Sequence, residues 1–457
     1  MALSALTVMH AAAAAVRGFA RTPRAARMSA FDGLARPNVC VVGGGFGGLY
    51  TALRFASLEW KGISKPRVRL IDRSDRFAFL PMMYELTTGT ASCWEVAPTF
   101  EEVLNGSGVE FVRGEVSGLD TEAKMVSVQG GGGELLLPYD QCVLALGSEA
   151  SFADVLGVRE FALPFYTLDD ALQLREHLLA RQRSTRGPPT RIVIVGGSYV
   201  GVELAANLHA KFGSQFDLTL VHRADALLTS SKEFSRLVGS QRLKESGVKV
   251  LLDTNVLRID ADGVDVCPAR GSAGSAGAPE QRLDADMVVW TAGTKPSRLA
   301  ASLGLPLDEA GRICTDATLR VDGCSSLYAL GDVASLTDAR GSRPPSTAQA
   351  AMQQADYAAW NVRAALLGGP TLAFRYADLG EMLSLGEGYG TLTALGAINL
   401  QGPLASLTRR AVYAARMPTT KQATRVGLSW AADAAASVAK GLLQSPRSGG
   451  AGRQDLH

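Results

Sequence analysis

A glycine-rich turn with the spacing of a phosphate-binding site begins at Gly43. Gly43, Gly45 and Gly48 directly follow the apolar run Val39–Val42, and Leu49–Ala56 continues as a predicted helix. A tight turn between a strand and a helix presents backbone N–H groups and the helix N-terminus to a pyrophosphate. The pattern G-x-G-x-x-G in this setting therefore predicts a dinucleotide site.

Two aspartates complete this first site further along the chain. Asp72 ends the apolar run Val68–Asp72, where a carboxylate accepts hydrogen bonds from a ribose diol; a solvated acid at a strand end is the alternative interpretation. The run Ser326–Ala334 (SLYALGDVA) carries Gly331 and Asp332 and resembles the second FAD signature of two-dinucleotide flavoproteins. This resemblance implies that the cofactor is FAD. The predicted FAD-binding residues are Gly43, Gly45, Phe46, Gly47, Gly48, Asp72, Arg73, Gly147, Gly331, Asp332 and Ala348.

The same plan recurs from Arg191 to Gly293. Gly196, Ser198 and Gly201 occupy the three motif positions after an apolar run, so a serine replaces the middle glycine. Two such units in one chain predict two dinucleotides side by side, which indicates electron transfer. The predicted NAD(P)H-binding residues are Gly196, Gly197, Ser198, Tyr199, Val200, Gly201, Arg223 and Gly293.

The second unit lacks the acid that NADH-binding units carry after their second strand. The apolar run Leu218–Val221 ends at His222 and Arg223 instead. An arginine fork suits a 2′-phosphate, so we expect NADPH to be accepted as well as NADH. A surface Arg223 without a ligand is the alternative.

Four further segments carry a family likeness: RFAFLPMMYELTTG, WTAGTKP, LYALGDVA and STAQAAMQQADYAAWN. With the first glycine turn, they resemble type II NAD(P)H:quinone oxidoreductases, and among these the plant and algal chloroplast enzymes that reduce demethylphylloquinone. The resemblance runs from about Val39 to Trp430. It implies hydride transfer from NAD(P)H to FAD and then transfer of two electrons to a membrane prenylquinone of the demethylphylloquinone or plastoquinone type, without proton pumping.

The resemblance also implies three catalytic side chains. The family element that matches Ala348–Gln353 lies beside the flavin ring, with its glutamines at the quinone pocket, which assigns Gln349 and Gln353 to the quinone; Gln354 matches as well. A glutamine amide donates to a quinone carbonyl and accepts from a quinol. A helix that only supports the flavin is the alternative. Glu203 matches a glutamate that reaches the nicotinamide, although an acid in a first helical turn is favourable without such a role.

Two other classes of function stay open. A reductase of the same fold with a protein acceptor, of the NAD(P)H:ferredoxin or apoptosis-inducing-factor type, shares both units. A non-catalytic nucleotide-binding or lipid-droplet protein is the other class, against which the intact FAD motif counts. The six cysteines are isolated, which argues against disulfide reduction, and Cys40 and Cys142 are expected in the core. The five scattered histidines predict no metal site, and a net charge of +2 predicts no nucleic-acid partner.

The two ends of the chain predict location. Residues 1–36 are rich in alanine and arginine, as in an organelle transit peptide, with a disordered tail as the alternative. We expect the chloroplast, at the plastoglobule or thylakoid surface; the mitochondrion is the alternative. An apolar stripe near the C-terminus predicts a helix that lies in a membrane interface, packs on the body of the protein or packs on a second copy in a homodimer. The stripe comprises Val426, Trp430, Ala434, Val438 and Leu442, and the basic residues expected to attract anionic lipids are Arg409, Arg410, Arg416, Lys421 and Arg425.

The predicted fold class is α/β, a flavoprotein with two Rossmann-like dinucleotide-binding units, each with a β-meander, and a short helical C-terminal region. The expected domains are 37–160 with 301–375 for FAD, 161–300 for NAD(P)H, and 376–457 for membrane association or dimerisation. The low-complexity run Ala269–Pro279 is expected to be a mobile hairpin insertion without chemistry.

Overall fold

The computed structural model describes residues 36–444 except 62–63, 153, 184–186 and 270–279, with side chains as far as residue 432. The predicted transit peptide and nearly all of the predicted hairpin insertion lie outside the described residues. The chain divides into two compact units, one ending at Arg409 and one beginning at Arg410.

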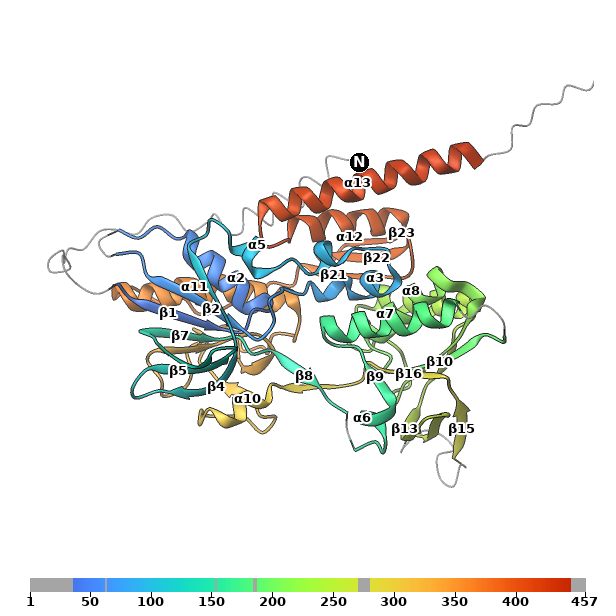
Figure 1. Ribbon diagram of the computed structural model, residues 1–457, viewed down its shortest axis with the longest axis horizontal. Coiled ribbons are helices and arrows are strands. Elements are labelled where there is room, and N and C mark those ends of the chain that lie inside the picture. Colours follow the sequence, from blue (N-terminus) through green and yellow to red (C-terminus); the bar gives the residue numbers. More distant parts are fainter. Residues whose placement is uncertain (1–35, 62–63, 153, 184–186, 270–279, 445–457) are drawn as a thin grey trace, which may run out of the picture. The chain divides into compact units, whose positions relative to one another are not determined.

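A five-stranded parallel sheet organises the first nucleotide unit. Its order is β19 (Leu327–Ala329), β7 (Gln141–Leu144), β1 (Asn38–Val42), β2 (Arg67–Asp72) and β3 (Val109–Arg113). Helix α2 (Phe46–Ser57) packs against β1, β2 and helix α11 (Ala348–Leu367). The antiparallel sheet of β4 (Glu115–Asp120), β5 (Met125–Gly130) and β6 (Gly133–Pro138) lies on the other side (Figure 1). Cys40 and Cys142 are fully buried in the core between these sheets, as predicted.

A second five-stranded parallel sheet repeats the plan. Its order is β12 (Lys249–Leu251), β11 (Phe216–Val221), β10 (Thr190–Val195), β16 (Met287–Trp290) and β9 (Ala162–Pro164). Its meander is β13 (Thr254–Asp260), β14 (Gly263–Pro268) and β15 (Gln281–Asp284), and a buried apolar cluster joins the two. The helices of this unit are α7 (Leu168–Arg183), α8 (Tyr199–Phe212) and α9 (Glu233–Ser246). The predicted fold class is confirmed by the two sheets and their two meanders.

Two connections join the nucleotide units, and they pair with each other. Strand β8 (Ser148–Ala150) leads out of the first unit, and β17 (Thr294–Pro296) returns antiparallel to it. The remaining short elements are η1 (Leu80–Met82), α3 (Met83–Thr88), α4 (Cys93–Val96), α5 (Phe100–Leu104), α6 (Val158–Phe161), η2 (Gly213–Gln215), α10 (Arg298–Ser302), β18 (Ile313–Cys314), η3 (Gly331–Val333) and β20 (Ala334–Ser335).

A third antiparallel sheet follows, which the sequence did not predict. It consists of β21 (Gly380–Ser384), β22 (Gly390–Ala394) and β23 (Ile398–Gly402), and it packs against α8 and α9. Helices α12 (Pro403–Ala415) and α13 (Thr420–Gln444) end the chain, as the predicted helical C-terminal region. Val426 and Trp430 are buried, whereas the stripe positions from Ala434 onward have side chains outside the described residues.

Candidate active site

Packing within the protein requires glycine at two of the three motif positions of the first turn and leaves free space at the third. Gly43 has φ +99°, and a Cβ there would come within 2.3 Å of the Ala145 carbonyl oxygen. A Cβ at Gly48 would come within 1.7 Å of the Gly43 oxygen. At Gly45, which caps α2, a Cβ would meet no atom within 4 Å. Gly45 is therefore not required by packing, and the turn keeps the free approach to its backbone that a pyrophosphate needs.

Asp72 closes this turn from the neighbouring strand. Its Oδ2 accepts from the Gly44 N–H at 2.6 Å and its Oδ1 from the Ser74 N–H at 2.7 Å. Burial raises the pKa of Asp72, and these hydrogen bonds oppose the rise. A carboxylate held in this way differs from the solvated strand-end acid that was the alternative interpretation.

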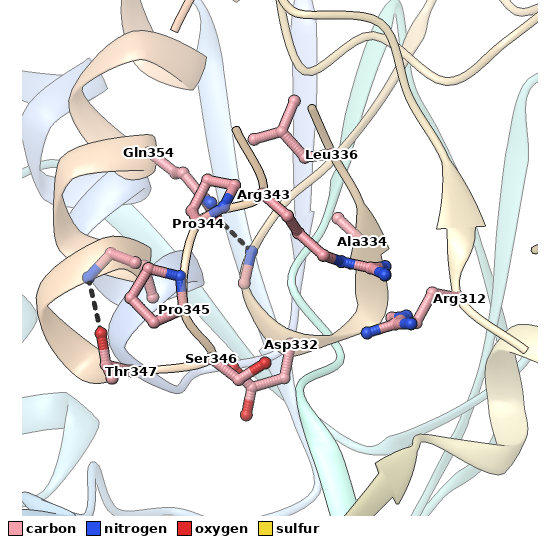
Figure 2. Close-up of a pocket in the computed structure, with 13 residues that line it drawn as sticks. Arg312, Asp332, Ala334, Leu336, Arg343, Pro344, Pro345, Ser346, Thr347 and Gln354 are labelled. Carbon is pink, nitrogen blue, oxygen red and sulfur yellow. Dashed lines mark hydrogen bonds between the residues drawn. The ribbon is translucent and has the colours of Figure 1, made fainter. Parts of the chain in front are cut away.

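The Gly331–Asp332 turn lies at the same edge of the sheet, because β19 runs parallel to β7 and β1. The Gly331 N–H donates to Gln354 Oε1 at 2.6 Å, and Asp332 Oδ2 accepts from the Ser148 hydroxyl at 2.9 Å. Both residues line a pocket with the N-terminus of α11 (Figure 2). Arg312 and Arg343 line it as well, and both pair with Asp308 at 3.1 Å.

The other predicted FAD residues lie on the segments that follow strands β1, β2 and β7, or at the start of helix α11. Phe46 packs edge-on against Phe77 and Phe79. Gly47 faces Leu330, Gly147 has φ +65°, and Arg73 is exposed. Ala348 begins α11, whose N-cap Thr347 accepts from the Ala350 N–H. The open turn, the anchored Asp72 and the Gly331–Asp332 turn fit the pyrophosphate and ribose of FAD.

The second glycine turn has the same construction. Gly196 has φ +119°, and a Cβ at Gly201 would come within 1.8 Å of the Gly196 oxygen. Ser198 caps α8 with φ −87° and ψ −168°, close to the −69° and −166° of Gly45. These angles suit any L-residue, which explains why a serine replaces the middle glycine here. The second turn therefore fits a dinucleotide despite the departure from the motif.

The remaining NAD(P)H-side residues are placed around this turn. Gly197 is buried, whereas Val200 and Arg223 are exposed. Tyr199 donates to Glu381 Oε2 at 2.5 Å, which ties the start of α8 to β21. Gly293 follows β16 with φ +76°. His222 was not predicted as a site residue, yet its Nδ1 accepts from the Gly197 N–H at 3.1 Å.

Glu203 lies at the centre of a buried polar cluster. Its Oε1 accepts from the Ser384 N–H at 2.8 Å and from the Tyr84 hydroxyl at 3.2 Å. Arg409 in turn donates to the Tyr84 oxygen and forms an ion pair with Glu85. Burial raises the pKa of Glu203 to about 7, against the lowering effects of the Ser384 N–H and Arg409. Such a carboxyl is able to exchange a proton near neutral pH.

This cluster decides between the two interpretations of Glu203 and corrects the predicted role of Arg409. Glu203 is buried and lies beyond the first turn of α8, so stabilisation of the helix end does not explain it. The prediction that Arg409 attracts lipid headgroups is wrong, because its side chain is only 2% exposed and pairs with Glu85. Arg410, in the second unit, stacks over the Trp430 ring at 5.7 Å.

Gln349 and Gln353 both bind the segment that leads into β21. Gln349 donates to the Gly380 oxygen at 3.0 Å and accepts from the Tyr376 hydroxyl and the Leu379 N–H. Gln353 donates to the Ala377 oxygen at 2.8 Å and accepts from the N–H of the same residue at 2.9 Å. Each of these amides donates one of its two N–H groups to the backbone of this segment, and direct contact of either with a quinone stays a prediction.

Comparison with known proteins identifies the family. Residues 37–355 match the pyridine nucleotide-disulphide oxidoreductases. The chain belongs to this family. This oxidoreductase is 42% identical over 398 residues to a demethylphylloquinone reductase of Synechocystis sp., a match that covers 87% of this chain and 96% of that protein. It is 38% identical to the alternative NAD(P)H-ubiquinone oxidoreductase C1 (chloroplastic/mitochondrial) of Arabidopsis thaliana, over 90% of this chain and 83% of that protein.

Solved structures agree on the fold. NDH2 of Plasmodium falciparum, solved in complex with NADH, superposes with a TM-score of 0.75 at 17% identity, over 86% of this oxidoreductase and 97% of that chain. As predicted, the protein is an FAD enzyme with NAD(P)H as substrate. This finding sets aside the non-catalytic alternative. Among the described residues, no helix is long and apolar enough to span a membrane.

Proposed function

We propose that this enzyme transfers electrons from NAD(P)H to a prenylquinone of the demethylphylloquinone or plastoquinone type. The proposal is carried by the 42% and 38% identity to two quinone reductases over nearly the whole chain. The Gly43 turn, Asp72 and Asp332 would hold FAD, which would supply the redox chemistry between NAD(P)H and the acceptor, without proton pumping. The alternative of a protein acceptor is disfavoured, because both of these relatives are quinone reductases.

The chain's own residues have three tasks in this proposal. The two glycine turns and Asp72 hold the dinucleotides through backbone N–H groups and a carboxylate. Glu203 takes up or releases a proton close to the nicotinamide, which its pKa of about 7 allows. Gln349 and Gln353 position the segment Tyr376–Gly380 for the quinone, since both amides bind that segment.

We also propose that the enzyme associates peripherally with a membrane of the chloroplast, at the plastoglobule or thylakoid surface, because its substrate dissolves in lipid. The Ala- and Arg-rich N-terminus and the name of the Arabidopsis relative support a plastid, with the mitochondrion as the alternative. Leu395, Leu404 and Leu407 at the β22–β23 turn and on α12 are each more than half exposed, as an interfacial surface requires. A homodimer is the competing use of such residues.

The test is steady-state kinetics of the FAD-loaded enzyme with NADH and NADPH against a panel of benzoquinones and naphthoquinones. We expect saturable quinone reduction with both nicotinamides. A ferredoxin-type protein acceptor, measured in parallel, should be reduced no faster than free flavin reduces it. Turnover with the protein acceptor and none with any quinone would overturn the proposal. Flotation with anionic vesicles tests the membrane association separately.

A further inference from the structure

A chain of three side chains connects the second nucleotide unit to Asp332, a predicted FAD residue of the first. Tyr166 follows strand β9 of the second unit, and its hydroxyl lies 2.5 Å from Oγ of Ser148. Ser148 is the first residue of β8, and its hydroxyl donates to Asp332 Oδ2 at 2.9 Å. Neither Tyr166 nor Ser148 belongs to a glycine turn, and the sequence predicted no role for either.

The chemistry of the three groups fixes the direction of this chain. An ionised carboxylate only accepts hydrogen bonds, so the single hydroxyl proton of Ser148 is committed to Asp332. The Ser148 oxygen then accepts from Tyr166, which is the donor of the contact between the two hydroxyls. Burial raises the pKa of Tyr166, and the negative charges of Asp332 and Glu149 raise it further, against the lowering effect of the Ser148 hydrogen bond. Tyr166 therefore keeps its proton at neutral pH and stays a donor.

Both hydroxyl groups come from backbone segments that are themselves held in place. The N–H groups of Tyr166 and Thr167 donate to Asp170 Oδ2 at 3.0 and 2.7 Å, which fixes Tyr166 at the start of α7. Ser148 lies opposite Pro296 in the antiparallel pair of β8 and β17. The chain of hydrogen bonds is therefore set by the fold and not by mobile side chains at the surface.

Asp332 has one carboxyl oxygen left for a ligand. Its Oδ2 accepts from Ser148, whereas its Oδ1 has no hydrogen-bond partner among the described residues. Asp332 lines the pocket at the start of α11 with Arg312 and Arg343, which both pair with Asp308 (Figure 2). Burial raises the pKa of Asp332, and the hydrogen bond from Ser148 opposes the rise. Ser148 thus stabilises the ionised carboxylate, which is a stronger acceptor for a hydroxyl group than a neutral carboxyl.

We propose that Tyr166 and Ser148 are positioning residues for FAD, which hold Asp332 by Oδ2 so that Oδ1 stays turned to a hydroxyl group of the cofactor. The second nucleotide unit thereby contributes, through Tyr166, to the retention of the cofactor of the first unit. The inference rests on the proposed placement of Asp332 at the FAD site.

The test measures the release of FAD from the full-length holoenzyme after dilution, by the rise of flavin fluorescence, between about pH 5 and about pH 8. Ser148→Ala removes the donor to Asp332. We expect FAD release to become roughly 2- to 10-fold faster, as for the loss of one hydrogen bond. The midpoint of the pH dependence of release should also move to higher pH, because Asp332 then binds its proton more tightly. Tyr166→Phe removes only the second donor and should change both quantities in the same direction but less.

Three further variants are the references for this measurement. Ser148→Thr keeps the hydroxyl group and should restore the release rate and the pH midpoint of wild type. Ser297→Ala, beside the same pair of strands, removes a hydroxyl group that bonds to Glu149 at 3.4 Å and not to Asp332, and it should release FAD as wild type does. Asp332→Asn removes the titrating group, so its FAD release should be faster and should lack this midpoint.

Two results would overturn the inference. A release rate and a pH midpoint unchanged in Ser148→Ala would show that the Ser148 donor does not act on the cofactor. Faster release at an unchanged midpoint, in Ser148→Ala and Ser148→Thr alike, would show that Ser148 only holds the strand. If Asp332→Asn also retained FAD as wild type does, the placement of Asp332 at the FAD site would fail too. FAD release involves no quinone, so these outcomes are independent of the proposed electron acceptor.

Discussion

The hydroxyl of Tyr84 donates to Oε1 of Glu203 across 3.2 Å and so joins two parts of the chain that are remote in sequence. Tyr84 belongs to α3, which follows the strand that carries Asp72, whereas Glu203 belongs to the helix that begins at the second glycine turn. Through this bond, the Glu203 carboxyl, which lies on a helix of the second nucleotide unit, contacts a helix that follows the second strand of the first unit. Arg409 extends the cluster through its own contacts with Tyr84 and Glu85.

Glu203→Gln should change the pH dependence of stability. The pKa of Glu203 is raised in the folded protein to about 7, from 4.5. The folded state therefore binds the proton more tightly, and the resulting stability is fully present below pH 4.5 and is lost as pH rises through 7. The shift corresponds to at most about 3.4 kcal/mol. We expect the Tm of wild type to fall more steeply than that of Glu203→Gln between pH 5 and about pH 8.

The same variant tests the role of Glu203 in turnover. Glutamine keeps the acceptor oxygen for Ser384 and Tyr84, so the cluster should persist while the titration near pH 7 disappears. A pH profile of kcat that loses its inflection in Glu203→Gln supports a proton-exchanging role. An inflection at the same pH in both proteins would assign it to another group.

Two valine substitutions should separate cofactor binding from folding in the first turn. A Cβ at Gly45 meets no protein atom within 4 Å, so Gly45→Val should fold and purify without FAD, because the side chain blocks the approach of the pyrophosphate. Gly48→Val places its Cβ 1.7 Å from the Gly43 oxygen and should be insoluble or strongly destabilised. Flavin absorbance per protein and circular dichroism distinguish the two. Full flavin in folded Gly45→Val would contradict the placement of the cofactor.

Local sequence patterns were enough to predict the two nucleotide units, the turns at Gly43 and Gly196 and the position of Asp72, because strand, glycine turn and helix follow one another within a few residues. The pattern was insufficient for the pairing of Arg409 with Glu85 and for the sheet β21–β23, which depend on contacts between distant segments. From the sequence alone, His222 indicates only that an acid is absent after the second strand of the second nucleotide unit. Its bond to Gly197 requires the parallel register of β10 and β11, which a single sequence does not state.

Arg409→Ala should be strongly destabilising. Removal of the guanidinium leaves Glu85 as an uncompensated charge at a site where both side chains are less than a tenth exposed. Breaking a buried ion pair in this way costs about 3–5 kcal/mol. Lys249→Ala breaks the exposed pair with Asp217 and should cost less than about 1 kcal/mol. Urea midpoints of the two variants provide the comparison, and equal shifts would argue that the Arg409 pair is not buried in solution.

Gln353→Ala should separate the two half-reactions. The variant loses both hydrogen bonds to the Ala377 backbone, each worth about 0.5–1.5 kcal/mol, which loosens the segment proposed to face the quinone. In anaerobic stopped flow, flavin reduction by NADPH should stay near wild type, while reoxidation by quinone slows or its KM rises several-fold. Gln173→Ala on the exposed face of α7 is the control. Slower flavin reduction with normal reoxidation would place Gln353 on the nicotinamide side instead.

Arg223→Glu should shift the enzyme from NADPH towards NADH. The exposed side chain follows His222 at the end of β11, so a carboxylate there repels the 2′-phosphate and offers an acceptor to the ribose of NADH. Losing one charge-assisted contact costs about 1.5–3 kcal/mol, or roughly 10- to 150-fold in kcat/KM for NADPH. Arg258→Glu, at an exposed position on β13, reverses charge away from the turn and should leave both substrates unaffected. An unchanged NADPH/NADH ratio in Arg223→Glu would mean that a residue other than Arg223 supplies the charge for the 2′-phosphate.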